Sequence, residues 1–164
     1  MNTIKMLKTW MDKFLFFINS IILTLLVIDV SWQVASRYFF ASPSTFTDEA
    51  ARFLMVWMSF LGGAYLFGSN SHLAVTILKD KMPKNIQDML ALFSYILIIV
   101  FAIIIMMYGS QRLILRTIGQ PSPSLGIPMG VFYSILPISA LCIIYYMIIN
   151  ICLLFLDKKS NDKE

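Results

Sequence analysis

The sequence predicts an all-α integral membrane protein with four transmembrane helices, on the strength of three observations. Of its 164 residues, 59% are hydrophobic and 13% are charged, whereas an ordinary soluble domain is about one quarter charged. The mean hydropathy is +0.78. The uncharged runs 89–111 and 117–156 exceed the roughly 20 apolar residues that one span requires. We therefore expect a single four-helix membrane domain over 1–156, followed by a solvated cytoplasmic tail over 157–164.

The first span is expected at about 14–40, a length that crosses the membrane with some tilt. Before it, apolar residues recur at helical spacing between the lysines of residues 1–12. This segment is either a short interfacial helix in the headgroup region or the start of the first span. Within the span, Asp29, Gln33 and Arg37 stand at i, i+4 and i+8, so one polar stripe follows a single helix face.

The second span, expected at about 47–68, opens with Asp48, Glu49 and Arg52. Thr45 and Asp48 have the spacing of a capping box, and acidic residues suit the positive end of a helix dipole. An unpaired charge within a bilayer costs roughly 3 kcal/mol or more. These three charges therefore need partners, and any functional interpretation has to account for them.

Small residues continue the same face of the second span. Ser59 and Gly63 lie four residues apart, the spacing that lets another helix backbone approach closely. Gly62 is either an ordinary glycine of a membrane helix or a further site of close approach. Trp57 is expected either at the lipid boundary or against a partner.

The third and fourth spans are expected at about 86–116 and 129–156. Arg112 and Arg116 stand one turn apart near the end of the third span, on one helix face. The connection between these two spans contains three prolines and two glycines but no charged residue. Pro137 predicts a kink in the fourth span.

The distribution of basic residues predicts the topology. All nine lysines lie in the N-terminal segment, in the 69–85 connection or in the C-terminal tail, and the other two connections contain no Lys or Arg. The positive-inside rule therefore places both termini in the cytoplasm. The four arginines then fall in the outer half of the membrane domain, where arginine suits paired, partly buried contacts.

The charged residues of the outer half form one candidate functional constellation, with Asp29 lying deeper. Three interpretations remain open: salt bridges between helices, a docking surface for a partner, or a proton-coupled carboxylate at Asp29. The outer-half residues are Arg37, Asp48, Glu49, Arg52, Arg112 and Arg116.

The residue inventory argues against an enzyme. His72 is the only histidine, and Cys142 and Cys152 lie within the last apolar run, so neither a pair of haem ligands nor a zinc site can be assembled. There is no glycine-rich phosphate loop and no set of residues for a catalytic triad. The net charge of +4 reflects membrane topology, and we expect no nucleic-acid partner.

The order of residues from Arg37 to the inner connection resembles the small membrane subunit of tripartite ATP-independent periplasmic (TRAP) transporters. In that family the first span ends in an arginine followed by aromatic residues. The second span opens with an aromatic residue and an acidic pair, followed by an arginine, a tryptophan and a Leu-Gly pair. A histidine then starts the inner connection. Phe46 stands where tryptophan is usual, and the four residues directly before the histidine, 68–71, include no basic residue although one is common there. The matching residues are Arg37, Tyr38, Phe39, Phe46, Thr47, Asp48, Glu49, Arg52, Trp57, Leu61, Gly62 and His72.

This resemblance implies a multi-pass subunit of a bacterial inner membrane. Its partners would be a large membrane subunit and a periplasmic substrate-binding protein, with membrane lipid on the remaining surfaces. The complex would import an organic acid, such as a sialic acid or a four-carbon dicarboxylate, coupled to a sodium gradient. Sodium would bind the large subunit, so no cofactor or metal is expected in this chain, whose role would be that of a scaffold.

Within that implied role, one face is expected to carry the packing. We expect Glu49, Arg52, Ser59 and Gly63, with the polar stripe of the first span, to join the first two helices to each other or to the large subunit. Two alternatives remain. One is a self-sufficient small exporter that uses Asp29 as its proton-coupled carboxylate, and the other is a structural accessory subunit of an unrelated membrane complex.

Overall fold

The computed structural model describes residues 2–40, 45–68 and 84–161, and within these ranges the chain is almost entirely helical. The third span contains a π-helical segment, and the 118–128 connection contains an isolated β-bridge between Pro121 and Pro128. The elements are α1 (Asn2–Phe40), α2 (Thr45–Gly68), α4 (Lys84–Phe101), the π-helix η1 (Ala102–Gly109), α5 (Ser110–Thr117), α6 (Met129–Tyr133) and α7 (Ile135–Asn161).

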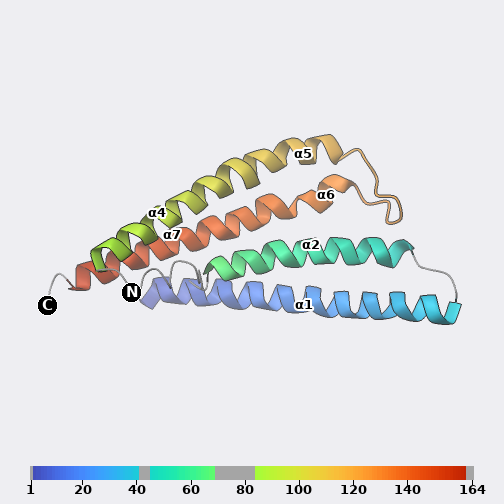
Figure 1. Cartoon of the computed structure of the whole chain (residues 1–164), viewed down its shortest axis with the longest axis horizontal. Helices are drawn as coiled ribbons and strands as arrows, with labels where there is room; N and C mark the ends of the chain where they lie inside the picture. Colours follow the sequence, from blue (N-terminus) through green and yellow to red (C-terminus); the bar gives the residue numbers. More distant parts are fainter. Residues whose placement is uncertain (1, 41–44, 69–83, 162–164) are drawn as a thin grey trace.

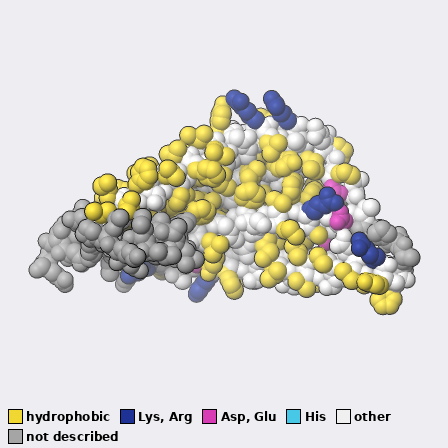
Figure 2. Space-filling view, viewed as in Figure 1, with side chains coloured by type: hydrophobic (Ala, Val, Ile, Leu, Met, Phe, Trp, Pro, Cys, Tyr) yellow, Lys and Arg dark blue, Asp and Glu magenta, His cyan; other side chains and the backbone are white. Residues whose placement is uncertain are grey.

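Four helical stretches are long and apolar enough to cross a membrane, which confirms the predicted fold class. They cover 4–39, 45–68, 86–117 and 129–156, close to the expected boundaries. Many large apolar side chains on their outer surfaces are exposed, as lipid contact requires. Figure 2 shows this apolar surface, with the charged side chains concentrated toward particular edges and ends.

The helices lie side by side in the order α1, α2, α7 and α4 (Figure 1). α2 packs against both α1 and α7, and α7 in turn packs against α4 and η1, while α5 packs against α6. The beginning of α1 and the end of α7 lie at the same end of the molecule. We call this end the lysine end, and the opposite end, where α1 ends and α2 begins, the arginine end. Which end faces the cytoplasm stays a prediction.

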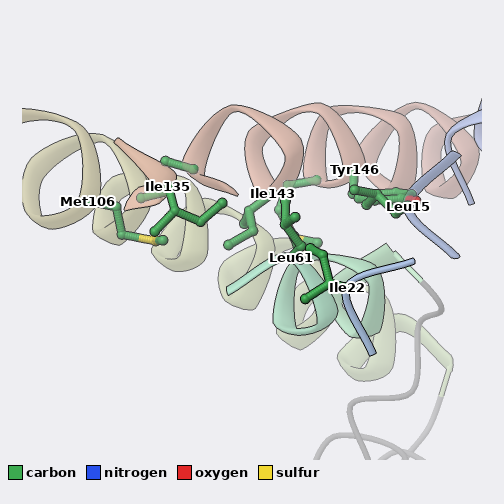
Figure 3. Packing of buried hydrophobic residues seen from close by; sticks show 11 residues of the cluster. Leu15, Ile22, Leu61, Met106, Ile135, Ile143 and Tyr146 are labelled. Carbon is green, nitrogen blue, oxygen red and sulfur yellow. The ribbon is translucent and has the colours of Figure 1, made fainter. Parts of the chain in front are cut away.

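The buried core lies mainly where α1, α2 and α7 meet. Leu15 and Tyr146 lie side by side there, and the cluster continues through Ile22, Leu61 and Ile143 (Figure 3). Tyr146 is the largest fully buried side chain among the described residues. Burial of such residues stabilises a single arrangement of the helices, because the ring fits only one pairing of neighbours.

The N-terminal segment is the start of the first span and not a separate interfacial helix. α1 runs without a break over 39 residues, and polar contacts tie its first turns to α7. The Tyr146 hydroxyl donates a hydrogen bond to Asp12 Oδ1 at 2.7 Å, and Lys8 Nζ lies 3.5 Å from Asn150 Oδ1. Of the apolar residues that suggested an interfacial helix, Met11 packs against the core, whereas Leu7 and Trp10 are exposed.

Pro137 predicts a kink in the fourth span, and the structure has a break in the helix about one turn before this proline. α6 ends at Tyr133 and α7 begins at Ile135, with Ser134 between them. Pro137 has no N–H to donate to the Tyr133 carbonyl, and its ring crowds that carbonyl, so the helix breaks at the residue four positions before it. α7 then continues to Asn161, into the segment expected as a solvated tail, since extending an existing helix is far easier than starting one.

Candidate functional site

At the arginine end, Asp48 joins the first two spans. Its Oδ1 accepts a hydrogen bond from Gln33 Nε2 of α1 at 3.3 Å, and its Oδ2 pairs with Arg52 one turn further along α2. The Arg52 side chain remains 74% exposed. Asp48 therefore acts in contacts between and within helices, and the Gln33 contact fixes the register of α1 against α2.

The neighbouring acid, Glu49, holds a different part of the chain. Its Oε2 accepts hydrogen bonds from the backbone N–H groups of Ser124 at 2.7 Å and Leu125 at 3.1 Å. Both donors belong to the connection between α5 and α6. A carboxylate that accepts two N–H bonds is a strong, charge-assisted anchor, so Glu49 attaches this connection to the beginning of α2.

The anchored connection has a defined backbone conformation of its own. The Ser122 N–H donates to the Ile127 carbonyl and the Met129 N–H donates to the Gln120 carbonyl, each at 2.9 Å. Gly126 closes the turn with φ +66°, a left-handed conformation that glycine adopts without steric cost. The connection is therefore an ordered loop that presents a fixed surface beyond the spans.

Aromatic residues support these polar contacts one turn below them. The rings of Phe53 and Phe132 stack with centroids 4.3 Å apart, and the Trp57 indole N–H donates to the Phe132 carbonyl at 3.3 Å. Trp57 is half-buried. It does not lie only at the lipid boundary, because its ring contacts another helix, and that helix belongs to the same chain. These contacts attach α2 to α6.

A hollow of about 860 Å³ opens above this site, and we call it the arginine-end hollow. Figure 2 shows acidic and basic side chains close together toward the arginine end of this face. Polar side chains line the hollow near the end of α1 and the beginning of α2, and apolar side chains line it further along α2. Its lining comprises Gln33, Arg37, Thr45, Asp48, Glu49, Arg52, Phe53, Met55, Val56, Pro123, Ser124, Met129 and Phe132.

Asp29 stands on α1 one turn before Gln33, and Gln33 contacts Asp48 of α2. Asp29 is half-buried, and its Oδ2 is buried without a hydrogen bond from the described residues. Of the predicted polar stripe, Gln33 and Arg37 both line the arginine-end hollow, whereas Asp29 is not among its lining residues.

The small residues of α2 lie in different environments. A Cβ added to Gly62 would lie 3.7 Å from Asn19 Oδ1 of α1, whereas one added to Gly63 would have no atom within 4 Å. The Ser59 hydroxyl donates to the Met55 carbonyl of its own helix. Ser59 and Gly63 line a second hollow of about 260 Å³ beside Leu97 and Ile143, which we call the central hollow. Gly62 is therefore the glycine that faces the first span.

The remaining two arginines do not join this cluster. Arg112 and Arg116 are exposed on α5, at the edge of the molecule away from α1 (Figure 1). Arg112 donates a hydrogen bond to the Tyr108 hydroxyl at 3.0 Å, and its guanidinium lies 5.1 Å from the centroid of that ring. The outer-half residues thus form two separate surfaces. His72 lies outside the described residues.

Sequence reasoning missed three contacts that hold the structure together. These are the Asp12–Tyr146 hydrogen bond, the anchoring of the loop by Glu49, and the close approach of Gly68 to the Tyr146 ring. An acid among the N-terminal lysines was the available signal for the first of them. Within residues 2–40, 45–68 and 84–161, no group of three or more His, Cys, Asp or Glu side chains is placed to hold a metal ion.

The four spans, with polar side chains used to join helix to helix, define a multi-pass helical membrane protein. Among such proteins, the family model described as "Tripartite ATP-independent periplasmic transporters, DctQ component" matches residues 26–157. The chain belongs to this family. It is a small membrane subunit of a TRAP transporter in the bacterial inner membrane, and such subunits are transporter components and not enzymes.

Three relatives illustrate the similarity. A protein of Haemophilus influenzae, provisionally named as a TRAP transporter small permease protein, is 32% identical over 112 residues, which are 68% of this chain and 69% of the relative. The sialic acid TRAP transporter small permease protein SiaQ of Vibrio cholerae is 28% identical over 66% of this chain and 63% of its own length. The isethionate TRAP transporter permease protein DctMQ of Oleidesulfovibrio alaskensis is 26% identical over 60% of this chain but only 16% of its own length.

Family membership excludes the interpretation as an accessory subunit of an unrelated complex. Asp48 and Glu49 both bond to other segments of the membrane domain, and their contact with another subunit stays a prediction.

Proposed function

We propose that this chain is the scaffold subunit that braces a large transporting subunit and helps to present the surface on which a periplasmic substrate-binding protein docks. The observation that carries the proposal is the use of the acidic pair. Asp48 attaches α1 to α2, and Glu49 attaches the loop between α5 and α6 to α2. The most polar part of the spans is thereby used for internal bracing.

The names of the relatives support a large membrane partner. In DctMQ, the segment similar to this chain is a small part of a longer permease protein. A chain of this size, similar to one part of that permease, is expected to bind a separate subunit that supplies the remainder. The sodium sites of the complex would then belong to that large subunit, and this chain would need no cofactor.

The transported substrate is an organic acid in this proposal. The names of two relatives specify sialic acid and isethionate, which are both small organic anions of different structure. Their identities to this chain are similar, at 28% and 26%, so the small subunit is a poor indicator of the substrate. Sialic acids and four-carbon dicarboxylates are the first substrates to test.

The proposal also assigns the orientation of the chain. With the lysine end in the cytoplasm, as the positive-inside rule predicts, the arginine end and the ordered loop face the periplasm. Arg112 and Arg116 then form an exposed basic edge on that side. Such an edge attracts an acidic surface and accelerates the encounter with a soluble partner.

Reconstitution tests the function. The large subunit is placed in liposomes with and without this chain, and uptake of labelled substrate is measured with the binding protein outside and an inward sodium gradient. Uptake that requires both membrane subunits supports the proposal. Uptake that is equal without this chain contradicts it, and so does transport by this chain alone driven by a proton gradient, which is the outcome expected of an exporter that uses Asp29.

A further inference from the structure

One face of α2 is left uncovered by the other helices of the chain. Asp48, Gly62 and Tyr65 face α1, while Phe53 and Trp57 face α6. Between these two directions lies a stripe of residues spaced three or four apart, which is one side of a helix. The stripe consists of Glu49, Arg52, Val56, Ser59 and Gly63.

Both hollows of the molecule lie along this stripe. Glu49, Arg52 and Val56 line the arginine-end hollow, and Ser59 and Gly63 line the central hollow. The lining residues of α2 extend from Thr45 to Phe67, a rise of about 33 Å along the helix. This equals roughly the whole thickness of the hydrocarbon core, whereas a lipid tail crosses only one leaflet of about 15 Å.

The stripe also has the chemistry of a helix contact. Gly63 has open space where a Cβ would stand, and the Ser59 hydroxyl is already bonded to its own helix. Two small residues four apart on one helix face allow another helix backbone to approach closely. The floor and opposite wall of the central hollow are apolar, as shown by Leu97, Phe101 and Ile143, so an apolar helix side chain would fill it.

The arginine end adds a charge requirement. Arg52 is paired with Asp48, and Glu49 is bonded to two backbone N–H groups. Arg37 lines the same hollow and is close enough to Asp48 for their charges to attract, but Asp48 is already bonded to Gln33 and Arg52 and makes no direct hydrogen bond with Arg37. Binding of a partner helix in the arginine-end hollow is favoured if that helix brings a carboxylate toward the Arg37 guanidinium.

We propose that a transmembrane helix of the large subunit lies along the α2 stripe, with its closest approach at Ser59 and Gly63 and an acidic residue near Arg37. This inference rests on the proposed function, because it names the surface on which the scaffold meets its partner. Lipid and a second copy of this chain are the competing occupants.

Bulky substitutions at Ser59 and Gly63 test the proposed helix contact directly. Gly63→Leu and Ser59→Leu should each reduce recovery of the large subunit with this chain in detergent by about tenfold, because the partner helix can no longer approach. The matched control is Thr24→Leu on α1. Thr24, like Ser59, is exposed and bonds the carbonyl four residues before it at 2.8 Å, and its substitution should leave recovery unchanged. The variants purified alone should elute and melt like the unaltered chain, since Gly63 faces open space.

Photocrosslinking identifies the occupant. A photoreactive phenylalanine analogue at position 63 should give an adduct with the large subunit in the assembled complex, and the same analogue at position 24 should not. An adduct only with lipid, or only with a second copy of this chain, overturns the inference. If the leucine variants recover the large subunit normally while uptake still requires this chain, the inference fails and the proposed function stands. If the unaltered chain itself does not recover the large subunit, the proposed function fails.

Discussion

A Cβ placed on Gly68 would lie only 2.4 Å from Cε1 of Tyr146. The last residue of α2 therefore packs directly against the largest fully buried side chain of the described chain. Only glycine permits this approach without a shift of the ring or of the helix.

We expect Gly68→Ala to destabilise the isolated subunit by about 1–3 kcal/mol, because an added methyl group overpacks a filled site. Thermal unfolding in detergent measures the effect as a lower melting temperature. Gly63→Ala is the control, since its Cβ meets open space and alanine favours a helix interior. Equal melting temperatures for both variants would contradict the packing described here.

The bond between Asp12 and Tyr146 should contribute to the attachment of α1 to α7. In a double-mutant cycle with Asp12→Asn and Tyr146→Phe, we expect a coupling free energy of about 1.5–3 kcal/mol, which is typical of a hydrogen bond to a charged group. Thermal or denaturant unfolding of the four proteins gives the value. Additive effects of the two substitutions would show that the two side chains do not interact.

Glu49→Gln should loosen the loop between α5 and α6. The glutamine keeps one oxygen but loses the charge that strengthens the bonds from the Ser124 and Leu125 N–H groups. Hydrogen–deuterium exchange of the peptide that contains these amides should become roughly ten times faster. Asp48→Asn is the control, because Asp48 contacts Gln33 and Arg52 instead. Unchanged exchange in the Glu49 variant would mean that the loop is held by its own hydrogen bonds.

The exposed arginines of α5 should assist docking of the binding protein. Arg116→Gln is expected to raise several-fold the binding-protein concentration needed for half-maximal uptake, most clearly at low ionic strength, because exposed charges act mainly on association. Uptake at saturating binding protein should stay unchanged. Lys5→Gln, at the opposite end of the molecule, serves as the control. An equal effect of both substitutions would place docking elsewhere.

Asp29→Asn separates a scaffold from a proton-coupled transporter. Asp29 is half-buried on α1, and asparagine keeps its size and hydrogen-bonding capacity there. We expect sodium-driven uptake by the reconstituted complex to fall less than twofold. A complete loss of uptake with the complex still assembled would instead assign Asp29 a role in the transport cycle.

The spans could be predicted from the sequence because hydrophobic length dominates in a bilayer, and α2 and α6 begin within two residues of the expected positions. That Asp48 and Glu49 would have partners was also foreseeable, since charges in this setting need them. Their actual partners were not, because helical periodicity identifies the face of a residue but not the element that the face meets. Arg112 and Arg116 were grouped with Arg37 for the same reason, although α5 lies at the opposite edge of the molecule.

The order of packing has a consequence for biosynthesis. The last span to be synthesised lies between the earlier ones, because α7 packs against both α2 and α4. Until it enters the membrane, the chain consists of an α1–α2 hairpin and a separate third span with little to hold them together. A nascent chain that stops before Met129 is therefore not a smaller version of the subunit. The hairpin and the third span are joined by the chain but share few contacts, so the final helix is the element that packs them into one domain.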